Sequence, residues 1–382
     1  MIYFDNAATS FPKPPTVRKA YISSLGFSAN PGRSGHSMSL KASEEVFNCR
    51  SAVADLFNMK SVENVILTPG CTFALNTVIK GTLKKGDHVV ISSLEHNSVV
   101  RPLQRLADDG MITYSVAKVY EGDDDKTLDS FRSCINKNTA LVICTHASNV
   151  FGIKLPVSRI AALCKYYGIL FCLDAAQTAG VEDIDINDLG ADFLCAPAHK
   201  GLFGTMGTGI LLINTDRIPE PLCEGGTGSG SLELSQPLAL PDRFESGTVN
   251  LGGVCALKEG ISFVKRKTPN RICDYEIGLM NILYSELLKN DKVILYTQRP
   301  TKDTHVPILS FNIKDKSSEE VASILDRRFS IAVRAGIHCS PLAHVSMGTD
   351  TIGTVRVAPS VFTTKDNISS LISAVDYISK AK

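Results

Sequence analysis

The stretch ILFCLDAAQTAGVEDIDINDLGADFLCAPAHKG, residues 169–201, decides the fold class of this chain. It contains two short apolar runs, 169–174 and 191–196, and polar residues follow each run closely. Apolar runs of this length are typical of strands that are buried on both faces. Such strands belong to parallel sheets with helices on both sides. The stretch therefore predicts an α/β fold whose functional groups lie just beyond the carboxyl ends of its strands.

The same alternation of strands and helices extends in both directions along the chain. Further apolar strands are expected at 62–68, 88–93, 112–116, 139–148 and 209–214, and helical patterns at 40–58, 72–83, 127–135 and 156–167. After about residue 256 the pattern changes to a long helical stretch (256–290), then to strands near 307–313, 331–336 and 354–360 with helices at 317–328 and 365–380. We expect a mostly parallel sheet in a large domain (16–255), and a smaller α+β domain that combines residues 1–15 with 256–382.

Composition excludes several classes of protein. The 382 residues carry 40 Lys and Arg against 39 Asp and Glu, so the net charge of +1 gives no electrostatic case for binding nucleic acid or an anionic membrane. No apolar run approaches the roughly 20 residues of a membrane span. The opening MIYFDNAATS lacks the basic and apolar regions of a secretion signal. The eleven cysteines are scattered without a C-x-x-C pair, which fits a reducing cytoplasm and argues against a disulfide framework or a metal site.

Four polar features follow predicted strands. Asp174 ends an apolar strand, where a carboxylate is costly unless it meets a cation or a strong donor; the alternative is a helix cap or a structural salt bridge. His199 and Lys200 follow the next strand. Apolar surroundings disfavour the charged amine and free it for Schiff-base chemistry, although an isolated lysine after a strand is usually a surface residue.

The other two features precede helices. The turn Gly70-Cys71-Thr72 presents backbone N–H groups and a hydroxyl that would hold a phosphate at a helix N-terminus, or Thr72 would simply cap that helix. His96 would lie against a flat cofactor ring, or it would hydrogen-bond a loop carbonyl. Together the four features indicate a pyridoxal phosphate site, with a lysine for the aldehyde, an acid for the pyridine nitrogen and a helix terminus for the phosphate. A nicotinamide cofactor is excluded because no G-x-G-x-x-G joins a strand to a helix.

Motifs along almost the whole chain resemble those of the class V aminotransferase family, and within it the cysteine desulfurase and selenocysteine lyase group. The matching stretches, in the family's order, are YFDNAATSFPKP (3–14), NPGRSGHSMS (30–39), LTPGCTFALN (67–76), SLEHNS (93–98), HASNVFG (146–152), LDAAQTAG (173–180), HKG (199–201), RFESGTVN (243–250) and RAGIHC (334–339). The resemblance implies the pyridoxal-phosphate fold type I.

The resemblance also implies roles for individual residues. Lys200 would hold the cofactor as a Schiff base, Asp174 would pair with the pyridine nitrogen, Gln177 would bond the phenolic oxygen, and His96 would stack on the ring and shuttle protons. The phosphate would be held by Thr72, by His199 and by the turn that contains Cys71. Thr248 resembles a residue that reaches the phosphate of the other subunit, so the resemblance implies a homodimer. Asn149 and Arg356 would hold the substrate carboxylate, with Arg334 as a second basic group nearby.

Cys339 resembles the sulfur-accepting cysteine of the family's short-loop branch. It follows Arg334 and His338, and neighbouring basic groups favour a thiolate. The sequence departs from the family at two positions. Pro197 stands where many desulfurases place a serine that contacts the phosphate, which removes one hydrogen bond, and Ile337 stands where short-loop relatives often have a second histidine.

The implied reaction converts L-cysteine to L-alanine and passes sulfur to Cys339 as a persulfide, for transfer to an acceptor protein or thiol. Two alternatives remain at this point. One is a selenocysteine lyase, acting on L-selenocysteine, or another C–S lyase on the same scaffold. The other is a non-catalytic sulfur carrier or partner-binding module. The presence of Lys200, Asp174 and Arg356 argues against a non-catalytic role. A true aminotransferase is disfavoured because it would leave Cys339 without a role.

Overall fold

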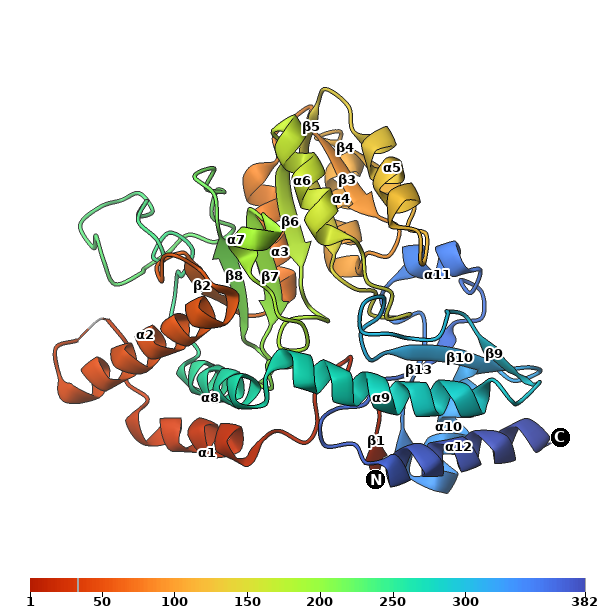
Figure 1. Ribbon diagram of the computed structural model, residues 1–382. Coiled ribbons are helices and arrows are strands. Elements are labelled where there is room, and N and C mark those ends of the chain that lie inside the picture. The colour runs from red at the N-terminus through yellow and green to blue at the C-terminus, as the bar shows by residue number, and fades with distance from the viewer. Residues whose placement is uncertain (33, 382) are drawn as a thin grey trace.

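A seven-stranded sheet lies at the centre of the fold, in the order β2-β8-β7-β6-β5-β3-β4 (Figure 1). Its strands are β2 (Val65–Thr68), β3 (His88–Ser92), β4 (Thr113–Ala117), β5 (Thr139–Thr145), β6 (Leu170–Asp174), β7 (Phe193–Pro197) and β8 (Gly209–Ile213). Only β8 runs against its neighbours, β7 and β2; the other pairs are parallel. This computed structural model, which describes residues 1–32 and 34–381, confirms the predicted mostly parallel sheet.

Alternate residues of the central strands enter two separate cores. Val90 of β3 and Val142 of β5 belong to one hydrophobic cluster, whereas Val89 and Leu141 belong to another. Successive side chains of a strand point to opposite faces, so both faces are buried, which explains the unbroken apolar runs of the sequence. The covering helices are α2 (Ser37–Phe57), α3 (Cys71–Thr82), α4 (Asn97–Asp108), α5 (Asp124–Cys134), α6 (Val157–Tyr167) and the short α7 (Ile186–Leu189), with α1 (Pro15–Ser24) and η1 (Leu25–Phe27) before them.

A second, antiparallel sheet lies beside the first, in the order β12-β13-β10-β9 (Figure 1). It consists of β9 (Val293–Leu295), β10 (Leu309–Ile313), β12 (Arg334–Gly336) and β13 (Thr354–Val357), with α10 (Ser318–Phe329), α11 (Pro341–Met347) and α12 (Lys365–Lys380) between and after them. The N-terminal strand β1 (Ile2–Tyr3) pairs in parallel with β11 (Ile331–Ala332). The start of the chain is thus joined to this later part; the proposed domain boundaries at 15/16 and 255/256 stay a prediction.

The helical stretch predicted at 256–290 is two helices, α8 (Leu251–Lys267) and α9 (Pro269–Leu287). Thr268 separates them with φ of 66°. A proline disfavours the α conformation in the residue before it and has no N–H to donate, so Pro269 ends one helix and begins the next. In Figure 1 the two helices follow one another below the large sheet.

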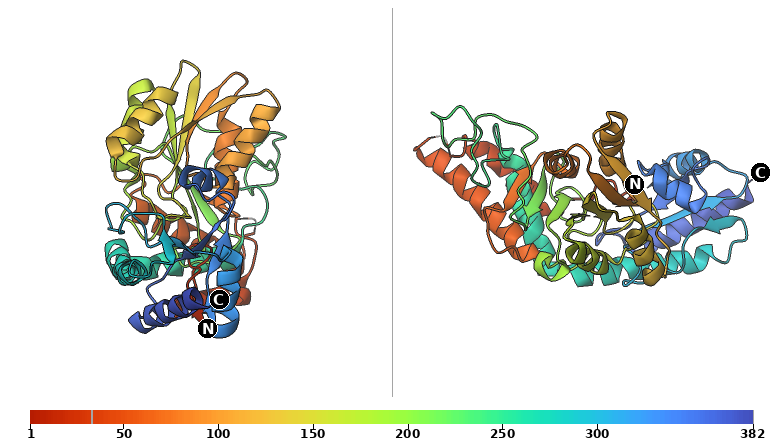
Figure 2. Two further views of the ribbon diagram at one scale, coloured as in Figure 1. Left: turned by 90° about the vertical axis from the view of Figure 1, so that its right-hand side faces the viewer. Right: turned by 90° about the horizontal axis from the view of Figure 1, so that it is seen from above.

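Residues 214–250 form no helix or strand, although they lie entirely in the described part of the chain. This long loop protrudes at the same end of the molecule as α2 in both Figure 1 and Figure 2. Gly32, shortly before α2, lines one hollow together with residues 224–231 and 233–237. Among the described helices, none has the length and apolar character needed to span a bilayer.

Candidate functional site

A cavity of about 620 Å³ opens where the parallel strands of the large sheet end. It brings together ten of the residues that the sequence singled out, namely Cys71, Thr72, His96, Asn149, Asp174, Gln177, His199, Lys200, Arg334 and Arg356. Its size suits a small-molecule ligand. Residues that are almost 300 positions apart therefore meet in one space. The strand-end argument predicted this for the features between residues 70 and 200, and the family resemblance added Asn149, Arg334 and Arg356.

Two of the ionisable groups that line this cavity are Lys200, which is half-buried, and Asp174, which is buried. Burial lowers the pKa of the Lys200 amine, while the Asp174 carboxylate and the Cys71 thiol oppose that shift. Burial raises the pKa of Asp174, while hydrogen bonds and the Lys200 charge oppose that shift. The donors to Asp174 are the Ala176 N–H (2.9 Å) and the Cys71 thiol (3.6 Å), and both reach Oδ1. The second oxygen, Oδ2, has no hydrogen-bond donor among the described residues and is available to a ligand.

A polar chain runs along the N-termini of α3 and α4. The Thr72 and Ser98 hydroxyls lie 2.9 Å apart, and the Ser98 Oγ lies 2.7 Å from Nδ1 of His96. The same Nδ1 accepts a hydrogen bond from the Ser98 N–H at 3.1 Å, so the proton of the neutral ring is on Nε2. Burial, followed by the charges of Lys200 and nearby arginines, lowers the pKa of His96 to about 4. His96 is therefore a neutral imidazole at pH 7.

The backbone of β8 approaches the turn at the start of α3 closely. A Cβ on Gly209 of β8 would lie 2.7 Å from Gly70, so only glycine lets the two backbones approach so closely. This close approach holds the Gly70-Cys71-Thr72 turn at the cavity wall. The same turn begins α3, and the free N–H groups of a helix's first turn favour a bound anion.

The N-terminal segment holds the backbone on which Lys200 sits. The His199 carbonyl oxygen accepts hydrogen bonds from the Ser10 N–H (2.9 Å), the Thr9 hydroxyl (3.1 Å) and the Lys13 amine (2.8 Å), and Ser10 Oγ donates to the Lys200 carbonyl at 2.9 Å. No pattern in the sequence singled out Thr9, Ser10 or Lys13. Their segment mixes polar and apolar residues without periodicity, so only the motif YFDNAATSFPKP as a whole marked it.

Arg356 is a buried cation with fixed partners. One Nη donates to the Asn149 carbonyl oxygen and the other to Asp5 Oδ1, both at 2.8 Å. Its Nε is buried without a hydrogen-bond partner among the described residues. Burial lowers the pKa of Arg356, and the Asp5 carboxylate opposes that shift. The guanidinium therefore has donor capacity left for an anion that enters the cavity.

Cys339 is exposed and is not among the residues that line the cavity. Its sulfur lies 3.7 Å from an Nη of Arg334, which does line the cavity. Cys339 therefore lies at the rim of the site. Thr248 is exposed and does not line the cavity of this single chain, so its role across a dimer stays a prediction.

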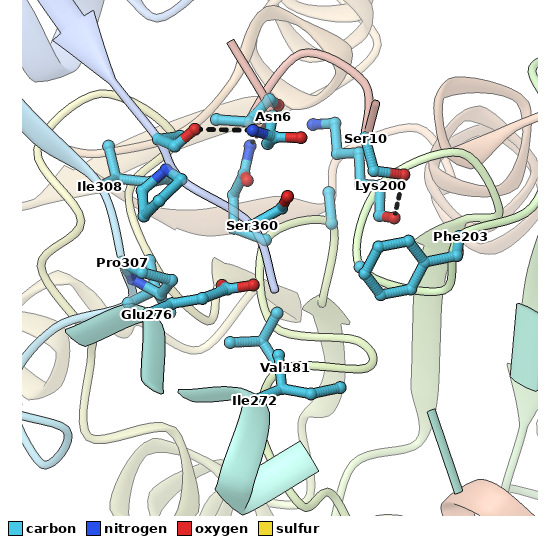
Figure 3. Close-up of a pocket in the computed structure, with 17 residues that line it drawn as sticks. Asn6, Ser10, Val181, Lys200, Phe203, Ile272, Glu276, Pro307, Ile308 and Ser360 are labelled. Carbon is cyan, nitrogen blue, oxygen red and sulfur yellow. Dashed lines mark hydrogen bonds between the residues drawn. The ribbon is translucent and has the colours of Figure 1, made fainter. Parts of the chain in front are cut away.

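A second cavity, of about 50 Å³, shares Lys200 and Gln177 with the first (Figure 3). It lies between the N-terminal segment (Asn6, Ser10), α9 (Glu276) and the chain after β13 (Ser360). Glu276 is 4% exposed. Burial raises its pKa to about 8, although a hydrogen bond from the Val361 backbone acts to lower it. No sequence signal marked this acid, because a single Glu in a helix is normally exposed.

The residues of the main cavity fit pyridoxal phosphate. His199 Nδ1 is buried there with no hydrogen-bond partner among residues 1–32 and 34–381 and would donate to or accept from a phosphate. Thr72 and the start of α3 supply further donors, Asp174 presents a free oxygen, and Lys200 supplies an amine whose neutral form is favoured. Pro197 also lines the cavity and supplies no side-chain donor there. In this α/β fold the cavity thus presents a lysine and an acid that would lie at opposite ends of such a cofactor's ring.

The chain belongs to the class V aminotransferase family, whose sequence profile matches residues 2–371. It is 32% identical to a probable cysteine desulfurase of Methanothermobacter thermautotrophicus, over 99% of this chain and 94% of that protein. It is 29% identical to a cysteine desulfurase of Salmonella agona, over 99% and 93%. The apo structure of a cysteine desulfurase from Thermococcus onnurineus superposes with a TM-score of 0.90 at 32% identity, covering 99% of this chain and 94% of that one. The predicted family and fold type are confirmed.

Proposed function

We propose that this chain is a pyridoxal-phosphate-dependent cysteine desulfurase, which converts L-cysteine to L-alanine and passes the sulfur to Cys339. The observation that carries the proposal is the joining, in one cavity, of Lys200, Asp174 and Arg356, with Cys339 at its rim beside Arg334. The similarity to cysteine desulfurases over the full length of the chain supports the same activity.

The cavity residues divide between cofactor and substrate. When bound, pyridoxal phosphate supplies an aldehyde for the substrate amine and a ring that withdraws electrons from the α-carbon. Lys200 would hold the aldehyde, Asp174 Oδ2 would receive the pyridine N–H, and Gln177 would bond the phenolic oxygen. Thr72, His199 and the Cys71 turn would hold the phosphate, and His96 would cover the ring.

Arg356 would bind the substrate carboxylate, with the Asn149 amide and Arg334 beside it. A neutral Lys200 amine would then take the α-proton, a role that its lowered pKa favours. His96, neutral at pH 7 with its proton on Nε2, would donate or return a proton within the cavity.

Cys339, reacting as a thiolate, would receive the sulfur. Its sulfur attacks the substrate sulfur, an S–S bond forms and the Cβ–S bond breaks, and the carbon fragment keeps the bonding electrons. Protonation of that fragment ends in alanine, while the enzyme holds a persulfide that an acceptor protein or thiol removes. Among the eleven cysteines only Cys223 and Cys339 are exposed. Cys71 is a poor alternative, because burial raises its pKa well above the usual value.

The test is a single turnover with L-cysteine, in which alanine and the masses of the cysteine peptides are measured. We expect one added sulfur on the peptide with Cys339 and none on the peptide with Cys71. The Cys339→Ala variant should bind L-cysteine and form no alanine from it, and Cys223→Ser serves as the matched control. Full desulfuration by Cys339→Ala would show that the protein is a simple C–S lyase.

A selenocysteine lyase is the second candidate, favoured by the position of Cys339 outside the cavity wall. Because a C–Se bond is weaker than a C–S bond, selenium would leave without a nucleophile. Activity of Cys339→Ala on L-selenocysteine equal to that of the parent protein, with little parent activity on L-cysteine, would select this candidate.

We also propose a homodimer in which Thr248 completes the partner's site, and a cytoplasmic location in keeping with eleven free cysteines. The dimer is supported by apolar side chains that are exposed on α2 (Met38, Leu40, Phe47) and on the protruding loop (Leu232, Leu234, Leu238).

A further inference from the structure

The Cys339 loop has an unfavourable backbone conformation. His338 and Cys339 have φ of 52° and 60°, so two consecutive residues with side chains occupy the left-handed region. This conformation is costly for residues other than glycine, and it persists only where surrounding contacts impose it. The loop between β12 and α11 must therefore be held from outside.

Asn149 makes contacts on both sides of Cys339. Its Nδ2 donates to the His338 carbonyl oxygen at 2.8 Å, and its Oδ1 accepts from the Ser340 hydroxyl at 2.6 Å. Asn149 and Ser340 are both buried, at 8% and 0% exposure, so water does not replace these bonds. A third bond, from the Asn97 N–H to the Cys339 carbonyl oxygen (2.8 Å), holds the middle of the loop.

Among the described residues, the Ser340 hydroxyl donates a hydrogen bond only to Asn149. Ser340 is the N-cap residue of α11, where a serine side chain commonly accepts from the helix backbone, but it makes no such bond here. Its hydroxyl is turned to Asn149 instead. Losing it would leave the buried Oδ1 of Asn149 without a donor, which costs more than an exposed hydrogen bond.

The Asn149 backbone also contacts the substrate side, since its carbonyl oxygen accepts from Arg356. We propose that Asn149 and Ser340 form a latch that fixes the Cys339 loop and ties the position of the thiol to the carboxylate site at Arg356. The second Nδ2 hydrogen of Asn149 remains free for a carboxylate in the cavity, so one amide serves both sites. Asn149 and Ser340 are in this respect positioning residues for Cys339, and the benefit for sulfur transfer rests on the proposed function.

Hydrogen–deuterium exchange of the cofactor-loaded protein, in the absence of L-cysteine, measures directly how firmly the latch holds the loop. In Ser340→Ala, we expect peptides that span residues 334–343 to exchange faster, on the order of tenfold, as the loss of one buried hydrogen bond implies. Ser340→Thr, which keeps the hydroxyl, should exchange like the parent. Asn149→Asp, which loses the donor to His338, should also speed exchange.

The matched control is Ser24→Ala. Ser24 is fully buried in α1, and its hydroxyl donates to the Tyr21 carbonyl oxygen at 2.7 Å, so the variant loses a similar bond far from the loop in sequence. Loop exchange should stay unchanged in this variant. Unchanged loop exchange in a folded Ser340→Ala protein would overturn the latch.

A single turnover with L-cysteine then measures how much the latch speeds sulfur transfer to Cys339. Persulfide formation on Cys339 should slow in Ser340→Ala by about the factor seen in exchange, with the dissociation constant of L-cysteine unchanged, because Ser340 does not line the cavity. Weakened L-cysteine binding with unchanged transfer would contradict the positioning role. If the parent protein places no sulfur on Cys339, the proposed function fails while the exchange result still decides the latch.

Discussion

Burial shifts the pKa values of Lys200 and Asp174 in opposite directions, and each shift favours the neutral form of the group. A cationic ring nitrogen next to Asp174 would oppose the effect of burial, because an opposite charge at short range favours the carboxylate. The pair would therefore suit the proposed cofactor, which brings a positive charge to Asp174 and reacts with the amine of Lys200.

Asp174→Asn should keep the fold and most of the cofactor but lose most of the turnover. Asparagine fills the same space, yet it does not stabilise a protonated ring nitrogen, so electron withdrawal from the α-carbon fails before cofactor binding does. Cofactor content by absorbance and alanine formation from L-cysteine measure the two effects separately. Near-normal alanine formation would mean that the essential acid lies elsewhere.

Lys200→Ala should abolish turnover, since no other lysine lines the main cavity among the described residues. Borohydride reduction of the parent protein, followed by peptide mapping, should place the pyridoxyl group on Lys200. Lys154 and Lys165 provide internal controls: Lys154 is paired with Glu182, and Lys165 lies in the last turn of α6. A pyridoxyl group on either lysine would refute the site.

At the scale of elements, the sequence predicted the strands of the large sheet well. Strands buried on both faces need continuous apolar runs, and these runs leave few other interpretations. The polar residues at their ends then marked Asp174, Lys200, Thr72 and His96 as one site, and all four line one cavity.

Contacts between distant segments were not predictable in this way. Asp5 meets Arg356 across 351 positions, and Ser340 meets Asn149 across 191. Neither pair leaves a periodic signal, because each depends on how the segments pack and not on local structure. The same holds for Glu276, whose burial follows from the approach of α9 to the chain after β13.

Glu276 makes the stability of this contact depend on pH. Its pKa is raised from 4.5 to about 8, so between these values the folded protein keeps a proton that the unfolded chain has released. The free energy of unfolding should therefore fall as the pH rises from about 5 to 8. Glu95 is also buried with its pKa raised to about 8, so Glu276→Gln should lessen this fall without removing it.

Urea unfolding of Glu276→Gln and its parent at pH 5 and pH 8 tests the prediction. The variant should be the more stable of the two at pH 8, and the two should differ less at pH 5. Glu286→Gln is the control on the same helix, because the Glu286 side chain is 42% exposed and forms an ion pair with Lys289. Equal pH dependence in the Glu276 variant and the parent would contradict the effect.

At the scale of the whole molecule, α2 and the loop 214–250 lie at the same end (Figure 2). Apolar side chains of both segments are exposed. Leu40 and Phe47 are apolar residues of the predicted amphipathic helix, yet they are 60% and 57% exposed. Contiguous apolar surface on a soluble protein commonly marks an interface. Thr248 lies in the same loop, so a second copy seated on this end would bring its Thr248 near the first copy's surface.

Mixing two inactive variants tests whether Thr248 acts across that interface. Lys200→Ala removes the amine, and Thr248→Asp would repel the phosphate by its negative charge. In a hybrid dimer, the chain with Lys200 would receive Thr248 from its partner, so one site is intact. Random reassociation of equal amounts should restore about a quarter of the parent activity, since half of the dimers are hybrids with one working site each.

Lys200→Ala mixed with Asp174→Asn should restore nothing beyond the residual activity of Asp174→Asn, because both residues belong to the same cavity of one chain. An active monomer in sedimentation, or no recovery in the first mixture, would place the function of Thr248 within its own chain.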